Sequence, residues 1–245
     1  MVVRVLGSSS KGNCYLFAAS NEVLVVECGL PLSEVKKSLQ WQINGIVGAI
    51  VSHAHNDHAK YIGEYMKNGI KVMALDDVFT AKQLAGHPFS RPLTPMKGVM
   101  VGGFKVLPLP VAHDVPCLAF VIEHAEMGRT LFVTDTMMLK WRVPHLNHIM
   151  IEANYSDQLL DEAILDGTTD KAMRARLLNS HMELGTTIRT LKANDLTDVS
   201  EILLLHLSHA HADGNEFKKI VISKVGIPCF VATAGLEIGI NINPY

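Results

Sequence analysis

The chain has 245 residues, of which 48% are hydrophobic and 19% are charged, a composition that excludes a disordered protein and suits one large globular domain over residues 1–245. Its formal net charge is −2, so its overall charge does not indicate a nucleic-acid binder, although a local basic patch would not show in the total. We find no run of eighteen apolar residues and no start typical of a signal peptide. These two features predict a cytoplasmic protein without membrane association and argue against an exported enzyme.

In chain order, short β-branched runs separated by Gly, Ser and Asn predict the strands of the first half. These are Val2–Leu6, Cys14–Ala18, Val23–Glu27, Gly48–Ser52, Val106–Pro108, Leu118–Glu123 and Thr130–Val133. Helices are expected at Ala59–Asn68 and Asp76–Leu84. The four cysteines lack CxxC spacing and are expected to be small buried side chains.

The second half contains fewer strands and more helices. Strands are expected at His148–Glu152, Ile202–His206 and Cys229–Ala232, and helices at Asp157–Leu165, Asp170–Leu178, Gly185–Asn194 and Asn215–Val225. Strands followed by helices, twice along the chain, predict an α/β (α+β) architecture. Two mixed sheets should pack face to face, with helices on the outside.

The most informative segment follows the strand that ends at Ser52. Four side chains that can bind metal occur there within six residues, in an HxHxDH pattern: His53, His55, Asp57 and His58. In an extended stretch, the first two histidines point to the same side and can hold one ion together. The last two residues lie where the chain turns into a helix and can reach a second ion. The imidazole and carboxylate groups suit zinc or manganese, and this spacing favours a metal site over an exposed histidine-rich loop.

Further ligands are expected at later strand ends, because loops at one edge of a sandwich gather there. His113, Asp135 and His206 each follow an apolar run directly. His209 and His211 repeat the HxH spacing and compete with His206, which we favour because it ends the strand.

This order of motifs resembles the metallo-β-lactamase superfamily over nearly the whole chain. The resemblance implies a four-layer αββα sandwich with a dinuclear centre, of zinc or manganese, at one edge of the two sheets. It assigns one metal to His53, His55 and His113, the other to Asp57, His58 and His206, and a bridging, catalytic role to Asp135. An aspartate at the bridging position, rather than a cysteine, indicates the phosphodiesterase and thioester-hydrolase branches.

Other segments resemble a bacterial group of metallo-β-lactamase-fold DNA exonucleases and, more distantly, ribonuclease Z-like enzymes. They are Gly7–Asn13, Thr134–Thr136, Glu152–Asn154, Ser180–His181 and His206–Ser208. The resemblance implies that His181 is a general acid that assists departure of the leaving group. It also gives candidate substrate-binding residues, namely Ser8, Ser9, Ser10, Asn13, Glu152 and Asn154. A tight turn explains the serine loop equally well, and Glu152 and Asn154 also suit the support of ligands.

Three features depart from the relatives or weaken the nucleic-acid interpretation. Glu27 stands where relatives usually have an aspartate, and we expect it to support a ligand rather than to bind metal. Lys171, Arg174 and Arg176 do not share one helix face, which favours a solvated surface over a phosphate-binding stripe. The aromatic content of 6% does not indicate a long base-stacking groove.

Three functions remain open from the sequence. The first is a metal-dependent phosphodiesterase acting on nucleic acid, with a DNA exonuclease as the favoured form. The second is a hydrolase of a small ester, thioester or lactone, as in glyoxalase II-like proteins. The third is a catalytically silent metal-binding relative, which the full set of seven ligands disfavours.

Overall fold

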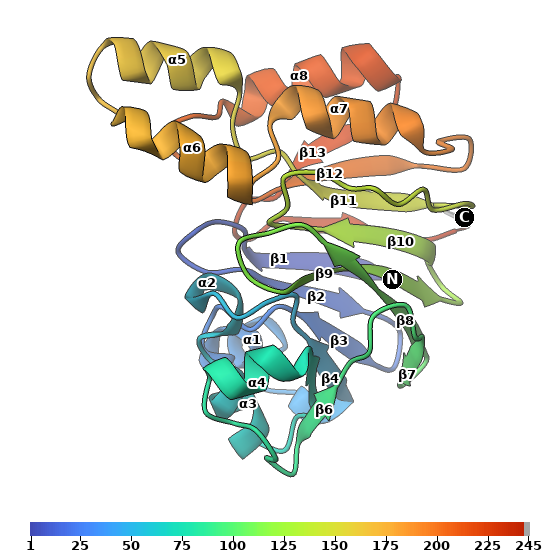
Figure 1. The fold of residues 1–245 in the computed structure, drawn as a ribbon. Helices are drawn as coiled ribbons and strands as arrows, with labels where there is room; N and C mark the ends of the chain where they lie inside the picture. The colour runs from blue at the N-terminus through green and yellow to red at the C-terminus, as the bar shows by residue number, and fades with distance from the viewer. Residues whose placement is uncertain (243–245) are drawn as a thin grey trace.

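Two seven-stranded mixed sheets pack face to face in the computed structural model, which describes residues 1–242 (Figure 1). The first sheet has the order β14-β1-β2-β3-β4-β5-β6 and the second has the order β13-β12-β11-β10-β9-β8-β7. The strands of the first sheet are β1 (Val2–Gly7), β2 (Cys14–Ala18), β3 (Val23–Val26), β4 (Ile46–Ile50), β5 (Val72–Ala74), β6 (Ser90–Pro92) and β14 (Glu237–Gly239). Those of the second are β7 (Val99–Val101), β8 (Phe104–Val111), β9 (Cys117–His124), β10 (Gly128–Val133), β11 (His148–Glu152), β12 (Glu201–Leu205) and β13 (Cys229–Val231).

Helices cover both outer faces of this sandwich, so the predicted αββα architecture is confirmed (Figure 1). The helices of the first half are α1 (Leu32–Ser38), α2 (Asn56–Ala59), α3 (Ile62–Lys67) and α4 (Asp76–Ala81), with a 3₁₀ turn, η1, at Ile43–Gly45. Those of the second half are α5 (Asp157–Leu165), α6 (Lys171–Ser180), α7 (Leu184–Ala193) and α8 (Gly214–Val225). None of the helices in the described residues is long and apolar enough to cross a membrane.

The main apolar core joins the inner faces of the two sheets. In it, the ring of Tyr15 on β2 meets the ring of Phe132 on β10 edge-on, with centroids 5.3 Å apart. A second core lies between the second sheet and its helices, where Phe217 and Val221 of α8 pack. The parallel strands β11 and β12 are therefore buried on both faces, which explains their almost unbroken apolar sequence.

The helix expected at Ala59–Asn68 is divided into α2 and α3, because tertiary hydrogen bonds replace one helical bond. The carbonyl of Asp57 accepts from the amide of Asn13 at 2.7 Å. The amide of Tyr61, which a continuous helix would pair with Asp57, donates instead to the carbonyl of Cys28 at 3.0 Å. The break fixes the metal-binding loop to the ends of β2 and β3.

Two smaller expectations are also met. The four cysteines are buried and free. In the basic stretch of α6, Arg174 forms ion pairs with Asp157 and Asp161 of α5, so this part of the chain follows the solvated-surface interpretation.

Candidate metal centre

The predicted ligands meet at one edge of the sandwich, just beyond the carboxyl ends of four strands. The HxHxDH segment follows β4, His113 follows β8, Asp135 follows β10 and His206 follows β12. Parallel strands deliver their carboxyl ends to the same edge of a sheet, and the packing of the two sheets brings together residues as far apart in the sequence as Asp57 and His206, which are 149 positions apart.

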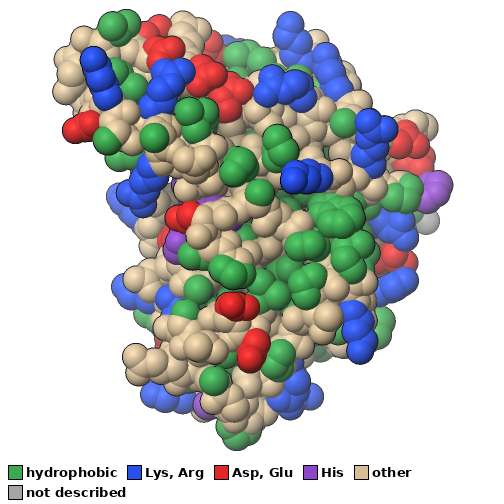
Figure 2. All heavy atoms as spheres, viewed as in Figure 1, with side chains coloured by type: hydrophobic (Ala, Val, Ile, Leu, Met, Phe, Trp, Pro, Cys, Tyr) green, Lys and Arg blue, Asp and Glu red, His purple; other side chains and the backbone are tan. Residues whose placement is uncertain are grey.

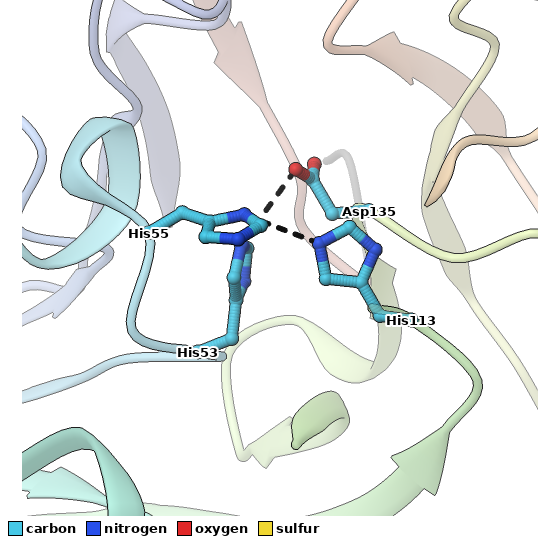
Figure 3. Close-up of side chains that lie close together, drawn as sticks. All are labelled: His53, His55, His113 and Asp135. Carbon is cyan, nitrogen blue, oxygen red and sulfur yellow. Dashed lines mark hydrogen bonds and ion pairs between the residues drawn. The ribbon is translucent and has the colours of Figure 1, made fainter. Parts of the chain in front are cut away.

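The first group of ligands contains three imidazoles and one carboxylate: His53, His55, His113 and Asp135. One ligand atom from each lies within 4.8 Å of the others, and the side chains point toward one another (Figure 3). His53 Nε2 is 3.7 Å from Asp135 Oδ2, and His113 Nε2 is 3.3 Å from His55 Nδ1. This arrangement could hold one cation.

The second group shares Asp135 with the first and adds Asp57, His58 and His206. His58 Nε2 lies 3.3 Å from both Asp57 Oδ2 and Asp135 Oδ2. His206 Nε2 is 3.2 Å from Asp57 Oδ2, and its Nδ1 is 3.3 Å from Asp135 Oδ1. Because one carboxylate serves both groups, two cations bound here would have Asp135 between them.

The chemistry of these donors fits divalent cations. His53 Nε2 is fully buried without a hydrogen-bond partner among the described residues, which is costly unless a cation occupies the site. Burial and the neighbouring His58 lower the pKa of His53, so its imidazole stays in the neutral form that binds metal. Burial opposes protonation of His206, but the negative charge of Asp135 raises its pKa to about 10. The carboxylates therefore create a potential that attracts positive charge.

Strained backbone marks three positions at this edge. Glu27, Asp135 and His206 have φ angles of 68°, 42° and 52°, in the left-handed region that side chains rarely adopt. Glu27 and His206 directly follow β3 and β12, Asp135 lies two residues after β10, and each turn aims the side chain into the centre. Such strain is retained where the surrounding structure enforces it, often at functional sites.

Additional polar groups form hydrogen bonds that orient the side chains of the candidate ligands. Ser52 Oγ lies 2.9 Å from His53 Nδ1, and the carbonyl of Ser180 accepts from His113 Nδ1 at 2.8 Å. The hydroxyl of Thr134 donates to Asp135 Oδ1 at 2.7 Å. Thr134 and Ser180 belong to segments that carry the family resemblance, but no role was predicted for them, and Ser52 was not predicted; its only signal is that it directly precedes His53. Asp114 was also missed, and its Oδ1 lies 3.0 Å from His113 Nε2.

His181 lies beside the metal ligands and is bound to a buried carboxylate. Its Nδ1 is 2.6 Å from Glu152 Oε1, and the other oxygen of Glu152 accepts from the amides of Thr136 and Met182. Asp135, Glu152, His181 and His206 form a third cluster of possible ligand atoms. Burial lowers the pKa of His181, but the charge of Glu152 more than offsets this, so that pKa is raised overall.

The candidate substrate-binding residues occupy several different positions. The side-chain nitrogen of Asn13, Nδ2, lies 3.0 Å from His58 Nε2. The side-chain nitrogen of Asn154 donates to the backbone carbonyl of His206 at 2.7 Å. Ser8 Oγ accepts from the amide of His206 at 2.9 Å. These three residues, like Glu152, support the ligand set.

Ser9 and Ser10 belong to a turn in which the carbonyl of Ser9 accepts from the amide of Gly12 at 2.9 Å. The two histidines that compete with His206 lie elsewhere. His209 is exposed, and His211 Nε2 is 2.8 Å from the hydroxyl of Thr169. Neither of them is in the ligand groups of the described residues.

Glu27 is expected to act on metal affinity through His58. It is fully buried, with Oε1 3.4 Å from His58 Nδ1 and Oε2 accepting from the amide of Ser52 at 3.3 Å. Changing Glu27→Gln keeps the shape but removes the charge that orients this ring. We expect a loss of about 10- to 100-fold in metal affinity, measured by competition with a chromophoric chelator. The exposed Glu34→Gln variant is the control, and an equal affinity in both variants would contradict this role.

Comparison with known proteins agrees with the fold. Residues 9–139 match the family model described as the metallo-beta-lactamase superfamily. The chain is 24% identical over 240 residues to "Exodeoxyribonuclease YycJ" of Bacillus anthracis, covering 90% of this chain and 87% of that protein.

Solved structures show the same fold. The metallo-beta-lactamase fold protein YhfI of Bacillus subtilis superimposes with a TM-score of 0.73 at 18% identity, over 97% of this chain and 99% of that one. The short form of human tRNase Z gives a TM-score of 0.63 at 13% identity, over 98% and 99% of the two chains. The family model covers more than half of the sequence, including six of the seven predicted ligands. This chain belongs to the metallo-β-lactamase superfamily of hydrolases.

Proposed function

We propose that this chain is a phosphodiesterase that uses two divalent metal ions and cleaves nucleic acid, with DNA exonuclease activity as its specific form. The observation that carries the proposal is the pair of His181 and Glu152, held beside the two ligand groups. It adds a proton donor to a site that can bind two cations. A small ester with a good leaving group would have less need of such a donor.

The metal-binding role is assigned to the residues whose donor atoms converge. His53, His55 and His113 would hold one ion, Asp57, His58 and His206 the other, and Asp135 both. Zinc and manganese both accept this set of imidazoles and carboxylates. When bound, the two ions would supply a water of lowered pKa and positive charge against the oxygens of the scissile group.

The remaining chemistry belongs to the side chains of this protein. Water adds its oxygen to phosphorus, the bond from phosphorus to the leaving oxygen breaks, and that oxygen needs a proton. His181 is placed to donate it: Nδ1 is fixed by Glu152, which leaves Nε2 as the ring atom directed to substrate. Burial opposes a charge on His181, but the charge of Glu152 raises its pKa overall, which favours the protonated ring that a general acid requires.

A lysine near the mouth of the site supports an anionic substrate. Lys82 Nζ donates to the side chain of Asn56 at 2.8 Å, and Asn56 lies within the HxHxDH segment next to Asp57. Lys82 is half-buried, which lowers the pKa of its ammonium group, and the nearby charge of Asp57 partly offsets this. Two similar proteins, the exodeoxyribonuclease and human tRNase Z, have names that refer to nucleic acids, which also supports a nucleic-acid substrate.

The direct test combines metal content with a panel of substrates. We expect about two metal ions per chain by elemental analysis. We also expect hydrolysis of 5′-labelled single-stranded or double-stranded DNA, with less activity on RNA and none on a thioester. Chelation should abolish this activity and lower the melting temperature by at least about 5 °C, because ligand present at 100 times its Kd stabilises the folded state by about 2.7 kcal/mol.

The other functions predict different results. Cleavage of the thioester alone would establish the small-ester hydrolase. Two bound metals without hydrolysis of any of these substrates would support the catalytically silent relative.

A further inference from the structure

The outer face of the second sheet carries a cavity that the metal centre does not use. Its volume is about 320 Å³, within the usual range of ligand sites. The floor is formed by Leu107, Leu109 and Val121 of β8 and β9, and the indole of Trp141 forms one wall. Figure 2 shows hydrophobic side chains gathered on this part of the surface, with Lys and Arg side chains around them. An apolar surface of this kind on a monomer often marks a binding site.

The pairing of β8 with β9 shows which side chains lie at each end of this cavity. Leu107 is paired with Val121, and one step toward the metal centre Leu109 is paired with Ala119. At the far end, the pair is Lys105 with Glu123. The cavity therefore runs from an aromatic and aliphatic end near the metal edge to a charged end away from it.

Two exposed cations line the cavity. Arg142 follows Trp141 and is exposed, and Lys105 is exposed at the far end. Arg129 also lines the cavity, but Glu123 binds it at 3.0 Å and offsets its charge. An amphiphile with a single head group would use one of these positions. A strand with regularly spaced phosphates would meet both Arg142 and Lys105.

One loop and one strand connect the residues that line the cavity to the candidate metal ligands. The loop after Asp135 contacts the residue before His113, because the amide of Met137 donates to the carbonyl of Ala112 at 3.3 Å. It then places the indole nitrogen of Trp141 2.8 Å from the carbonyl of Pro110. His113 is the third residue after Pro110, a distance of roughly 10 Å along the chain.

We propose that this cavity binds an unpaired nucleobase of the substrate strand, stacked on Trp141, with the neighbouring phosphates on Arg142 and Lys105. The proposal rests on the proposed phosphodiesterase function and adds that the substrate is single-stranded beside the metal centre. One ring suffices for one base, which agrees with the low aromatic content of the chain. Stacking on an indole tolerates every base, so the site would select single strands without selecting a sequence.

The test compares two substrates of the metal-loaded enzyme. One is the eight-nucleotide strand of thymidylate, and the other is thymidine 5′-(p-nitrophenyl phosphate), which is too short to reach the cavity from the metal centre. Trp141→Ala should raise KM for the octanucleotide by about 5- to 100-fold. Its kcat, and both constants for the small diester, should stay within about twofold. Trp141→Phe should restore most of the affinity, and Arg142→Gln should raise KM and weaken its salt dependence.

Trp41, the other of the two tryptophans, supplies the matched control, since it is 68% exposed and far from Trp141 in the sequence. Trp41→Ala should change none of these constants. An unchanged KM for the octanucleotide in the Trp141→Ala and Arg142→Gln variants, with normal cleavage of the small diester, would overturn the inference and leave the proposed function intact.

Fluorescence tests the cavity independently of catalysis. In the Trp41→Phe variant, Trp141 is the sole tryptophan, and a phosphorothioate octanucleotide should quench its emission. Quenching by dodecanoate and not by the oligonucleotide would overturn the inference in favour of an amphiphile. A concentration-dependent dimer that Trp141→Ala dissociates, with no oligonucleotide effect, would overturn it in favour of a second copy of the chain. Failure of the proposed function alone would appear as quenching without hydrolysis of either diester.

Discussion

Asp135→Ala is expected to reduce phosphodiester hydrolysis by at least about 10³-fold and to leave at most one metal ion bound per chain. Asp135 is the carboxylate that both ligand groups share, and its oxygens lie 3.3 Å from nitrogens of His58 and His206. Without it, neither cation keeps its full set of donors, and several kcal/mol of charge stabilisation in the transition state are lost. The measurements are metal content by elemental analysis and kcat/KM on labelled DNA.

Two further variants separate this effect from misfolding. Asp135→Asn tolerates the left-handed backbone and keeps the shape, so a similar loss in this variant would identify the charge as the cause. The exposed Asp198→Asn should behave as the unaltered chain. Two metals and full activity in Asp135→Ala would contradict the shared-ligand assignment.

His181→Ala is expected to have an effect that depends on the leaving group. Cleavage of DNA requires a proton on the departing nucleoside oxygen, so kcat should fall by about 10²- to 10⁴-fold. A p-nitrophenyl ester releases an oxygen that is stable as an anion, and its kcat should fall by less than about tenfold. The ratio of the two rate constants is the measurement, and it does not depend on the amount of active enzyme.

His209→Ala is the matched control, because this histidine is exposed and belongs to none of the ligand groups of the described residues. Metal content should be unchanged in both histidine variants. An equal loss on both substrates in His181→Ala would assign His181 to the support of His113 or His206 rather than to proton donation.

The architecture and the meeting of the candidate ligands were predictable, because His53, His113, Asp135 and His206 each come within three residues after a strand. The HxHxDH segment after β4 contains four side chains that can bind metal within six residues. The apolar runs before Asp135 and His206 are typical of buried strands, and both form strands. Parallel pairing of β10, β11 and β12 then brings their ends together. The sequence pattern is sufficient for this part because local preference and tertiary packing agree.

Features that depend on tertiary contacts were not predictable. The three-residue strands β5, β6, β7 and β14 have too few residues to show alternation and depend on pairing with a neighbour. The break between α2 and α3 requires Asn13 and Cys28 to take over backbone bonds. Lys82, just after α4, contacts Asn56, which lies 26 residues earlier in the sequence, so no motif contains both residues.

The left-handed backbone at Glu27, Asp135 and His206 has a consequence for how this protein can change over time. Each such residue lowers folding stability by about 1–3 kcal/mol relative to a relaxed turn. Glycine at any of these positions would relieve the strain while removing a group that faces the centre. Selection for thermal robustness alone would therefore favour replacing the very residues that the centre needs, a trade-off between stability and activity built into three strand ends.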